Sequence, residues 1–223
     1  MKNITDSYNT LKEEIPQTVK LVAVTKTRTT DEIMELYRAG HRIFGENRVQ
    51  ELLSKKDKLP ADIEWHIIGH LQTNKIRSVA PFIGMIESVD SYRLLKTIND
   101  EAAKAGRIIR CLLQIHIADE ESKFGFTMQE LGDMLRDNRP GDFKNVAICG
   151  VMGMATFTDN IEKVASEFAF LKKSFSIIKE RYMNNDEVFS EISMGMSGDF
   201  KTAIEQGSTM VRIGSLIFGE RNR

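Results

Sequence analysis

The sequence predicts an α/β fold: a single (β/α)8 TIM barrel with an extra helix at its N-terminus. Two observations predict it. Short apolar runs rich in Val and Ile alternate with longer amphipathic stretches, and eight such runs occur within 223 residues. Near-continuous apolarity is typical of parallel strands that are covered on both faces. A closed barrel usually takes about 250 residues, so residues 1–223 are expected to form one compact domain.

The expected strands are the apolar runs themselves. They are Leu21–Thr25, Arg42–Gly45, Trp65–Gly69, Met85–Val89, Cys111–Ile117, Val146–Met152, Val188–Ser193 and Met210–Gly214.

The stretches between the strands carry capping residues and apolar residues at helical spacing. Helices are expected from Thr30 to Gly40, from Ser91 to Gly106, after Thr127, after Asp159 and from Asp199 to Gly207, with the extra leading helix over Thr5–Ile15. The rival fold is a doubly wound open sheet, in which a glycine-rich phosphate loop usually follows the first strand. Lys26–Arg28 follow it here and contain no glycine, which favours the barrel.

Composition narrows the function classes. Lys and Arg number 31 against 32 for Asp and Glu, and this balance argues against a surface built for nucleic acid. No apolar run is long enough to span a membrane, and the polar N-terminus is not a signal sequence. Cys111 and Cys149 lie in apolar runs, as expected in a reducing compartment. The chain is therefore expected to be a cytoplasmic protein, a monomer, without a metal site.

Functional groups of a barrel stand at the carboxyl ends of its strands. Lys26 follows the first strand directly, where partial burial would lower its pKa and favour the free amine that Schiff-base chemistry needs. The alternative is that Lys26 merely reaches water at the strand end.

Two loops at the other end of the chain are rich in small residues. Ser193–Asp199 opens a helix, and Gly214–Ser215 follow the last strand. Such loops let backbone N–H groups approach an anion, and barrels often hold a phosphate after strands seven and eight. The glycines could equally serve only the turns.

An amine opposite a phosphate cradle suggests a ligand with a carbonyl at one end and a phosphate at the other. Pyridoxal 5′-phosphate and phosphorylated sugars both fit. Arg212 would donate a hydrogen bond to a pyridine nitrogen and leave it unprotonated, which weakens the ring as an electron sink. A simple salt bridge from Arg212 to phosphate or carboxylate is the alternative.

Taken together, these motifs resemble the YggS/PROSC family of pyridoxal 5′-phosphate homeostasis proteins, which share the barrel of the alanine racemase N-terminal domain. The matching segments are Val22–Lys26, Phe44–Asn47, Trp65–Gln72, Lys123–Gly125, Gly150–Met154, Ser193–Ser197, Val211–Gly214 and Ile217–Gly219.

The resemblance implies that Lys26 forms the Schiff base with pyridoxal 5′-phosphate and that Arg212 contacts the ring nitrogen. It further implies a phosphate cup and other cofactor-binding residues; these are Ser193, Ser197, Gly214, Ser215, Asn47, His70 and Met152. Arg48 stands where the family often has Tyr, so this chain does not carry that aromatic ring.

The resemblance favours a carrier or buffer of the cofactor, with transient contact with apo forms of pyridoxal-phosphate enzymes, over an enzyme. Racemisation needs two bases, and Tyr8, Tyr37, Tyr92 and Tyr182 all fall in helical windows. Alternatives are a weak racemase-like enzyme and a Schiff-base aldolase acting on a phosphorylated sugar.

Other polar residues have structural interpretations. His66 and His116 are expected to be hydrogen-bonded structural histidines, and Met154, Met194 and Met196 to fill space around the mouth. Lys55–Lys58 is most simply a solvated helix end.

Overall fold

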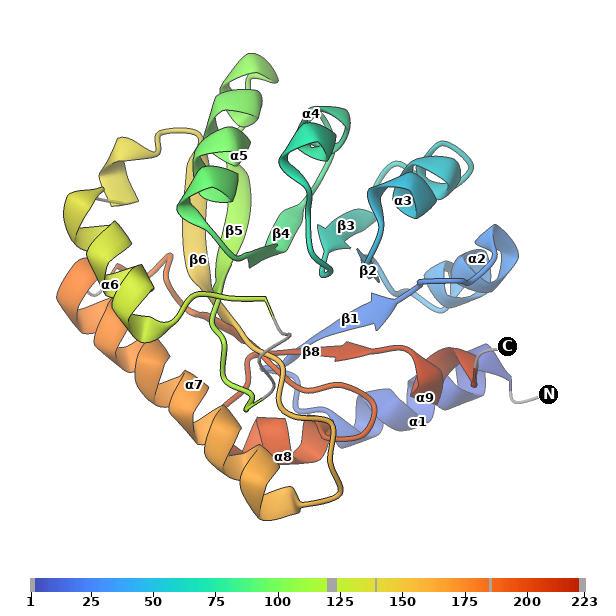
Figure 1. Ribbon diagram of the computed structural model, residues 1–223. Coiled ribbons are helices and arrows are strands. Elements are labelled where there is room, and N and C mark those ends of the chain that lie inside the picture. The colour runs from blue at the N-terminus through green and yellow to red at the C-terminus, as the bar shows by residue number, and fades with distance from the viewer. Residues whose placement is uncertain (1–2, 120–123, 139, 185, 221–223) are drawn as a thin grey trace.

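Eight parallel strands close into a barrel in the computed structural model, which describes residues 3–119, 124–138, 140–184 and 186–220 (Figure 1). The strands follow one another around the barrel in chain order, and β8 pairs with β1 to close it. The predicted TIM-barrel fold is therefore confirmed. The strands are β1 (Lys20–Val24), β2 (Ile43–Glu46), β3 (Glu64–Ile67), β4 (Met85–Val89), β5 (Ile109–Gln114), β6 (Val146–Met152), β7 (Glu191–Ser193) and β8 (Met210–Ile213).

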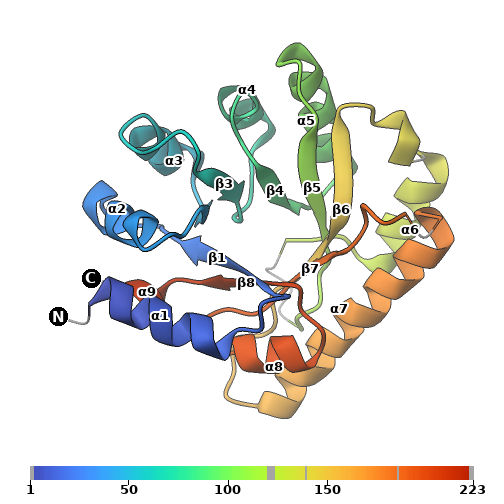
Figure 2. The ribbon, with the colours of Figure 1, turned by 180° about the vertical axis from the view of Figure 1, so that it is seen from behind.

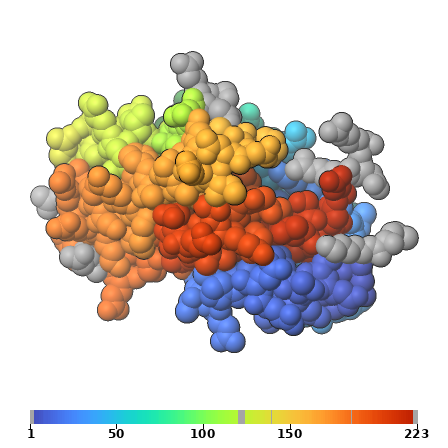
Figure 3. All heavy atoms as spheres, turned by 90° about the horizontal axis from the view of Figure 1, so that it is seen from below, coloured from blue at the N-terminus to red at the C-terminus, as the bar shows by residue number. Residues whose placement is uncertain are grey.

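Helices surround the barrel on its outside (Figures 1 and 2). They are α1 (Ile4–Glu14), α2 (Thr30–Arg38), α3 (Val49–Lys56), α4 (Ile76–Val79), α5 (Tyr92–Lys104), α6 (Met128–Asp137), α7 (Ile161–Tyr182), α8 (Phe200–Glu205) and α9 (Ser215–Phe218), with short 3-10 turns at Thr73–Lys75 and Pro140–Asp142. The extra leading helix α1 lies along the C-terminal segment, blue beside red in Figure 3.

Capping fixes where several helices begin. Thr29 and Glu32 form a reciprocal capping box at α2, and Thr127 and Glu130 form another at α6. Each box satisfies backbone N–H groups that have no partner within the helix. The longest helix, α7, begins one residue later than expected because the side chain of Asn160 caps it.

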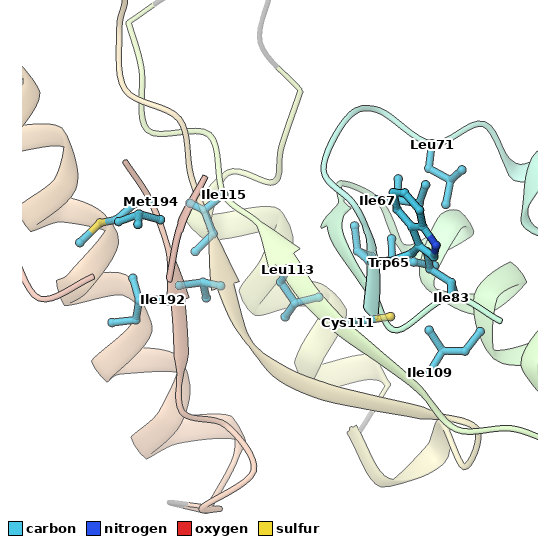
Figure 4. Packing of buried hydrophobic residues seen from close by; sticks show 14 of the residues in the cluster. Trp65, Ile67, Leu71, Ile83, Ile109, Cys111, Leu113, Ile115, Ile192 and Met194 are labelled. Atoms are coloured by element: carbon cyan, nitrogen blue, oxygen red, sulfur yellow. The ribbon is translucent and has the colours of Figure 1, made fainter. Parts of the chain in front are cut away.

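Apolar side chains pack in two layers. The larger cluster lies between the strands and the helices. Figure 4 shows part of it, with Trp65 and Ile67 of β3 close to Leu71 and Ile83. A smaller cluster fills the inside of the barrel; it contains Val22, Val24, Ile68, Met85, Leu112, Cys149, Met152 and Met210. Packing inside the barrel means that its centre is a core, and that open space is confined to its ends.

Two predicted strands differ from the observed strands by three residues at one end. The run Val188–Ser193 becomes extended only at Glu191, because Val188 and Phe189 form a turn around Asp186 and Val188 is 51% exposed. The run Cys111–Ile117 ends as a strand at Gln114, after which Ile115 forms a single bridge to Phe126.

Both cysteines are unpaired and buried, as the sequence indicated. Within the described residues, no helix combines the length and apolarity needed to cross a membrane.

Gly150 allows β6 and β7 to approach each other closely. A Cβ built there would lie 1.8 Å from the carbonyl oxygen of Glu191, and φ is +156°. Gly150→Ala is expected to lower the free energy of unfolding by about 3 kcal/mol, because the strands would have to separate. Urea titration measures this. Gly141→Ala is the matched control, since a Cβ there meets no atom within 4 Å, and an equal loss in both variants would contradict the prediction.

Candidate functional site

A cavity of about 330 Å³ opens at the carboxyl ends of β1, β7 and β8. Its described lining residues come from both ends of the chain and from the loop after β6: Val24, Lys26, Arg28, Phe157, Met196, Ser197, Gly198, Asp199, Arg212, Gly214 and Ser215. Five of the residues singled out from the sequence, Lys26, Ser197, Arg212, Gly214 and Ser215, therefore line one cavity. This position is where barrels of this type place their functional groups.

Lys26 occupies a tight turn directly after β1. Thr25 before it is fully buried, Lys26 is partly buried, and the N–H of Arg28 donates to the Thr25 carbonyl at 2.9 Å to close the turn. Thr27 has φ of +64°, which is uncommon for a residue with a side chain. The turn thus places Lys26 in the wall of the cavity.

The two loops rich in small residues meet across the cavity from β1. The backbone N–H of Gly214 donates to Ser197 Oγ at 3.4 Å, which joins the loop after β7 to the start of α9. Gly195 makes this possible, because its φ is +98° and a Cβ there would lie 2.6 Å from that of Ala203. Serine hydroxyls and backbone N–H groups are the donors that an anion requires.

Arg212 reaches the cavity from inside the barrel. Its side chain is only 3% exposed. Its Nη1 donates to Ser193 Oγ at 2.6 Å, and its Nη2 donates to the carbonyl oxygen of Gly153 at 3.0 Å. These two contacts fix the plane of the guanidinium, which leaves its remaining N–H groups to face other partners.

A buried carboxylate supplies the negative charge for Arg212. Glu87 on β4 is fully buried, and its Oε2 accepts a hydrogen bond from Ser193 Oγ at 2.5 Å and lies 4.0 Å from Arg212 Nη1. Burial acts to raise the pKa of Glu87, but the hydrogen bond and charge of His66 and the charge of Arg212 outweigh burial, so the pKa is lowered. A buried arginine thus has an ionised partner, as burial of charge requires.

His66 continues the same network toward the other end of the barrel. Its Nδ1 lies 2.7 Å from Glu87 Oε1, and its Nε2 lies 2.9 Å from Glu64 Oε1. Burial acts to lower the pKa of His66, but the two carboxylates raise it further than burial lowers it. Glu64 also pairs with Arg110, and its hydrogen bond to His66 lowers the pKa of that carboxyl to about 2. The expected structural role of His66 matches these contacts.

Two sequence-derived candidates lie beneath the cavity. Ser193 is fully buried between Glu87 and Arg212, so its hydroxyl supports the arginine and is not part of the described cavity wall. Met152 is also fully buried and packs with Val22 and Met210 inside the barrel. Neither is part of the described cavity lining, and their expected contacts with a ligand stay a prediction.

Asn47 and His70 line a neighbouring cavity of about 260 Å³, together with Arg48 and Lys75. His70 Nδ1 lies 2.7 Å from Asp90 Oδ2, and its ring stacks on Phe124 with the ring centres 4.0 Å apart. The Oδ1 atom of Asn47 is buried and has no hydrogen-bond partner within the described residues. Neither residue is among the described lining of the cavity that Lys26 lines, so their expected contact with a ligand there stays a prediction.

Sequence reasoning missed Glu87 and misjudged Lys55. An acidic residue in the middle of the apolar run Met85–Val89 was a signal, because a buried charge needs a partner. Lys55 was expected at a solvated helix end, but it is only 6% exposed.

The matching motif Lys123–Gly125 begins outside the described residues, at Lys123. Within the described residues, no cluster of three or more His, Cys, Asp or Glu side chains is arranged to hold a metal ion.

Comparison with known proteins identifies the family. The family model described as alanine racemase, N-terminal domain, matches residues 1–222. The pyridoxal phosphate homeostasis protein of Aquifex aeolicus is 36% identical over 203 residues, which cover 91% of this chain and 87% of that protein. Its human namesake is 38% identical over 215 residues, covering 91% of this chain and 77% of that protein. The chain belongs to the pyridoxal phosphate homeostasis protein family. The resemblance inferred from the motifs is confirmed.

Solved structures agree with this family assignment. PipY of Synechococcus elongatus with pyridoxal phosphate bound has a TM-score of 0.89 and 32% identity, covering 97% of this chain and all of PipY. Alanine racemase of Bartonella henselae has a TM-score of 0.72 at 17% identity, covering all of this chain and 61% of the racemase. The similarity to the racemase shows a shared fold.

Arg48, which stands after Asn47 where the resemblance implied Tyr, also lines the second cavity. It is exposed and lies directly before α3, where its side chain makes no capping hydrogen bond. The lining of the second cavity therefore includes two basic residues in this chain, Arg48 and Lys75.

The raised pKa of His66 predicts a pH dependence of stability. A raised pKa means that the folded protein binds this proton more tightly than the unfolded chain does. The stabilisation is therefore present in full below about pH 6.5 and is lost as the pH rises through the raised value. His66→Gln is expected to flatten the decline in the free energy of unfolding above that pH.

Urea titrations across the pH range measure this effect. His116→Gln is the control, because the His116 ring contacts the carbonyl oxygen of Ala118, whereas the His66 ring contacts two carboxylates. A wild-type stability that stays level above pH 6.5, or a decline that persists unchanged in His66→Gln, would contradict the assignment.

Proposed function

We propose that this protein binds pyridoxal 5′-phosphate in the cavity lined by Lys26, holds it as a Schiff base on that lysine, and acts as an intracellular carrier or buffer of the cofactor. The observation that carries the proposal is that one cavity is lined by an amine, a buried arginine and a cradle of small residues. Support comes from PipY, a structural neighbour solved with pyridoxal phosphate bound.

The residues present fit this cofactor. The cavity, at about 330 Å³, is near the lower limit of typical small-molecule sites and suits a compound with a single ring. Gly214 also suits close approach, since a Cβ there would lie 3.1 Å from the carbonyl oxygen of Val24. The bound cofactor would supply an aldehyde that condenses with an amine and a phosphate that needs several donors.

Each group of the chain has a proposed role. Lys26 provides the nucleophilic amine, and Ser197 with the backbone N–H groups of Gly214 and Ser215 binds the phosphate. Arg212 donates to the ring nitrogen. Because arginine does not release its proton, that nitrogen stays unprotonated and the ring is a weak electron sink. Ser193 and Glu87 orient Arg212 for this contact.

These roles favour a carrier over an enzyme. A racemase needs a second base opposite the lysine, and the four tyrosines, all in the described part of the chain, are absent from the described cavity lining. Tyr8 is buried beside His41, for example, and Tyr37 donates a hydrogen bond to Asp62. The relatives above are named as homeostasis proteins, which agrees with this interpretation. A weak racemase-like activity is the alternative outcome of the tests below.

The proposal extends to partners and location. A carrier would contact apo forms of pyridoxal-phosphate enzymes transiently, and it would do so as a monomer in the cytoplasm. Phe157 is 98% exposed and Met196 is 37% exposed, and both border the cavity. Exposed apolar side chains at the mouth suit brief contact with another protein. The buried, unpaired cysteines suit a reducing compartment.

Trapping the cofactor tests the attachment. The protein, incubated with pyridoxal 5′-phosphate and reduced with borohydride, is expected to carry a pyridoxyl group on the peptide that contains Lys26. Lys26→Ala should lose this label and the yellow colour. Lys201→Ala is the control, because Lys201 is exposed and pairs with Glu14. Equal labelling of the wild type and Lys26→Ala, as measured by peptide mass spectrometry, would overturn the proposal.

Transfer and turnover separate a carrier from an enzyme. The loaded protein is expected to restore the activity of an apo pyridoxal-phosphate enzyme, whereas α-proton exchange of L-alanine in deuterated water should stay near the rate of free cofactor. A single positioned base accelerates proton transfer by about a hundredfold or more. Exchange faster than the free-cofactor rate by that factor would favour the racemase-like alternative. NMR of the amino acid measures it.

A further inference from the structure

A buried group of charged residues lies behind the turn that carries Lys26. Lys55 on α3 is 6% exposed, and its Nζ donates to Glu46 Oε1 and Glu51 Oε1, at 2.7 Å in both cases. Glu46 is fully buried at the end of β2. Removing charged groups from water costs free energy, so a lysine in this position calls for an explanation beyond surface solvation.

The group contacts the backbone on both sides of Lys26. Lys55 Nζ donates to the carbonyl oxygen of Thr25 at 2.8 Å, and Thr25 Oγ1 donates to Glu46 Oε1 at 2.6 Å. The backbone N–H of Thr27 donates to Glu51 Oε1. The residue before Lys26 and the residue after it are therefore both held by hydrogen bonds, and Lys26 between them lines the cavity.

The conformation of the turn needs such support. Thr27 has φ of +64°, a left-handed conformation that a β-branched residue rarely adopts, because its side chain crowds the backbone. Such residues persist where the surrounding structure determines them. Here the surrounding structure is the Lys55 group, since Glu51 accepts from the N–H of this same residue.

We propose that Lys55, with Glu46 and Glu51, is a positioning residue for Lys26: it holds the turn after β1 so that the amine of Lys26 faces the cavity. The inference rests on the proposed function, because it concerns the lysine to which the cofactor would attach. Lys55 is not part of the described cavity lining and acts through Thr25 and Thr27. Its proposed effect is on the amine, whereas the phosphate cradle lies in the segments that follow β7 and β8.

Two ligands separate positioning from general support. Pyridoxal 5′-phosphate needs both the cradle and the amine, whereas pyridoxine 5′-phosphate, which has an alcohol in place of the aldehyde, needs the cradle alone. Lys55→Met is expected to slow formation of the borohydride-reducible adduct on Lys26 by about tenfold, the scale of a small misplacement of a reacting group. The affinity for pyridoxine 5′-phosphate should change by less than about twofold. This is well below the tenfold change in Kd that corresponds to about 1.4 kcal/mol.

Lys56→Met is the matched control on the same helix, because Lys56 pairs with the exposed Asp57. It should leave both measurements at wild-type values. A Lys55→Met variant with a wild-type adduct rate, or one in which both ligands weaken equally, would overturn the inference.

Two further variants keep the test decisive if Lys55→Met fails to fold. Glu51→Ala removes the acceptor of the Thr27 N–H from a partly exposed position and should slow adduct formation in the same way. Thr27→Gly combined with Glu51→Ala should restore at least half of the adduct-formation rate that Glu51→Ala loses, because glycine adopts positive φ without the steric cost. Failure of both effects would contradict the positioning role.

Hydrogen exchange of the protein without cofactor gives a readout that does not depend on the proposed function. In Glu51→Ala, amides of residues 25–28 are expected to exchange about tenfold faster, as when one hydrogen bond of about 1.4 kcal/mol is lost, with β1 unchanged. Unchanged exchange at residues 25–28 would overturn the inference. Absence of any adduct in the wild type, with faster exchange in the variant, would overturn the proposed function and leave the positioning of the turn intact.

Discussion

Pairing between the first and last strands of the barrel is the constraint on which the candidate site depends. β1 pairs with β8 from Lys20 and Met210 to Ala23 and Ile213, so the segments that follow the two strands emerge side by side. Lys26 and the Gly214–Ser215 segment are far apart in the sequence, yet they line one cavity because the sheet closes. In an open sheet these two strands could lie at opposite edges, and no such cavity would form between them.

Buried charge is used on both sides of this cavity in the same manner. Below it, Glu87 connects His66 to Ser193 and Arg212 through hydrogen bonds across the inside of the barrel. Beside it, Glu46 and Lys55 hold the turn after β1. In these two networks, each buried ion has a partner of opposite charge, which limits the cost of burial and restricts the geometry of the groups that reach the surface.

The fold was predictable because its signal is local and repeated. Each strand is an apolar run, and the stop and start signals of most helices lie within a few residues of the observed ends. Lys26, Ser197 and Arg212 were predictable for a related reason, since they stand at or just after strand ends.

The positions of Ser193 and Lys55 could not be predicted from the sequence. Ser193 lies before the reversal at Gly195 and Ser197 after it, and the sequence does not show which serine reaches the cavity. Lys55 is buried because it pairs with Glu46 of β2. The polar sequence at the end of α3 gives no sign of this pairing with another element.

The central claim is that Lys26 and the cradle of Ser197, Gly214 and Ser215 bind the two ends of one cofactor. A crystal structure of the protein soaked with pyridoxal 5′-phosphate tests it most directly. The account predicts continuous density from Lys26 Nζ to the ring, with the phosphate against Ser197 and the N–H groups of Gly214 and Ser215. A phosphate bound instead in the second cavity, beside Arg48 and His70, with Lys26 unmodified, would contradict it.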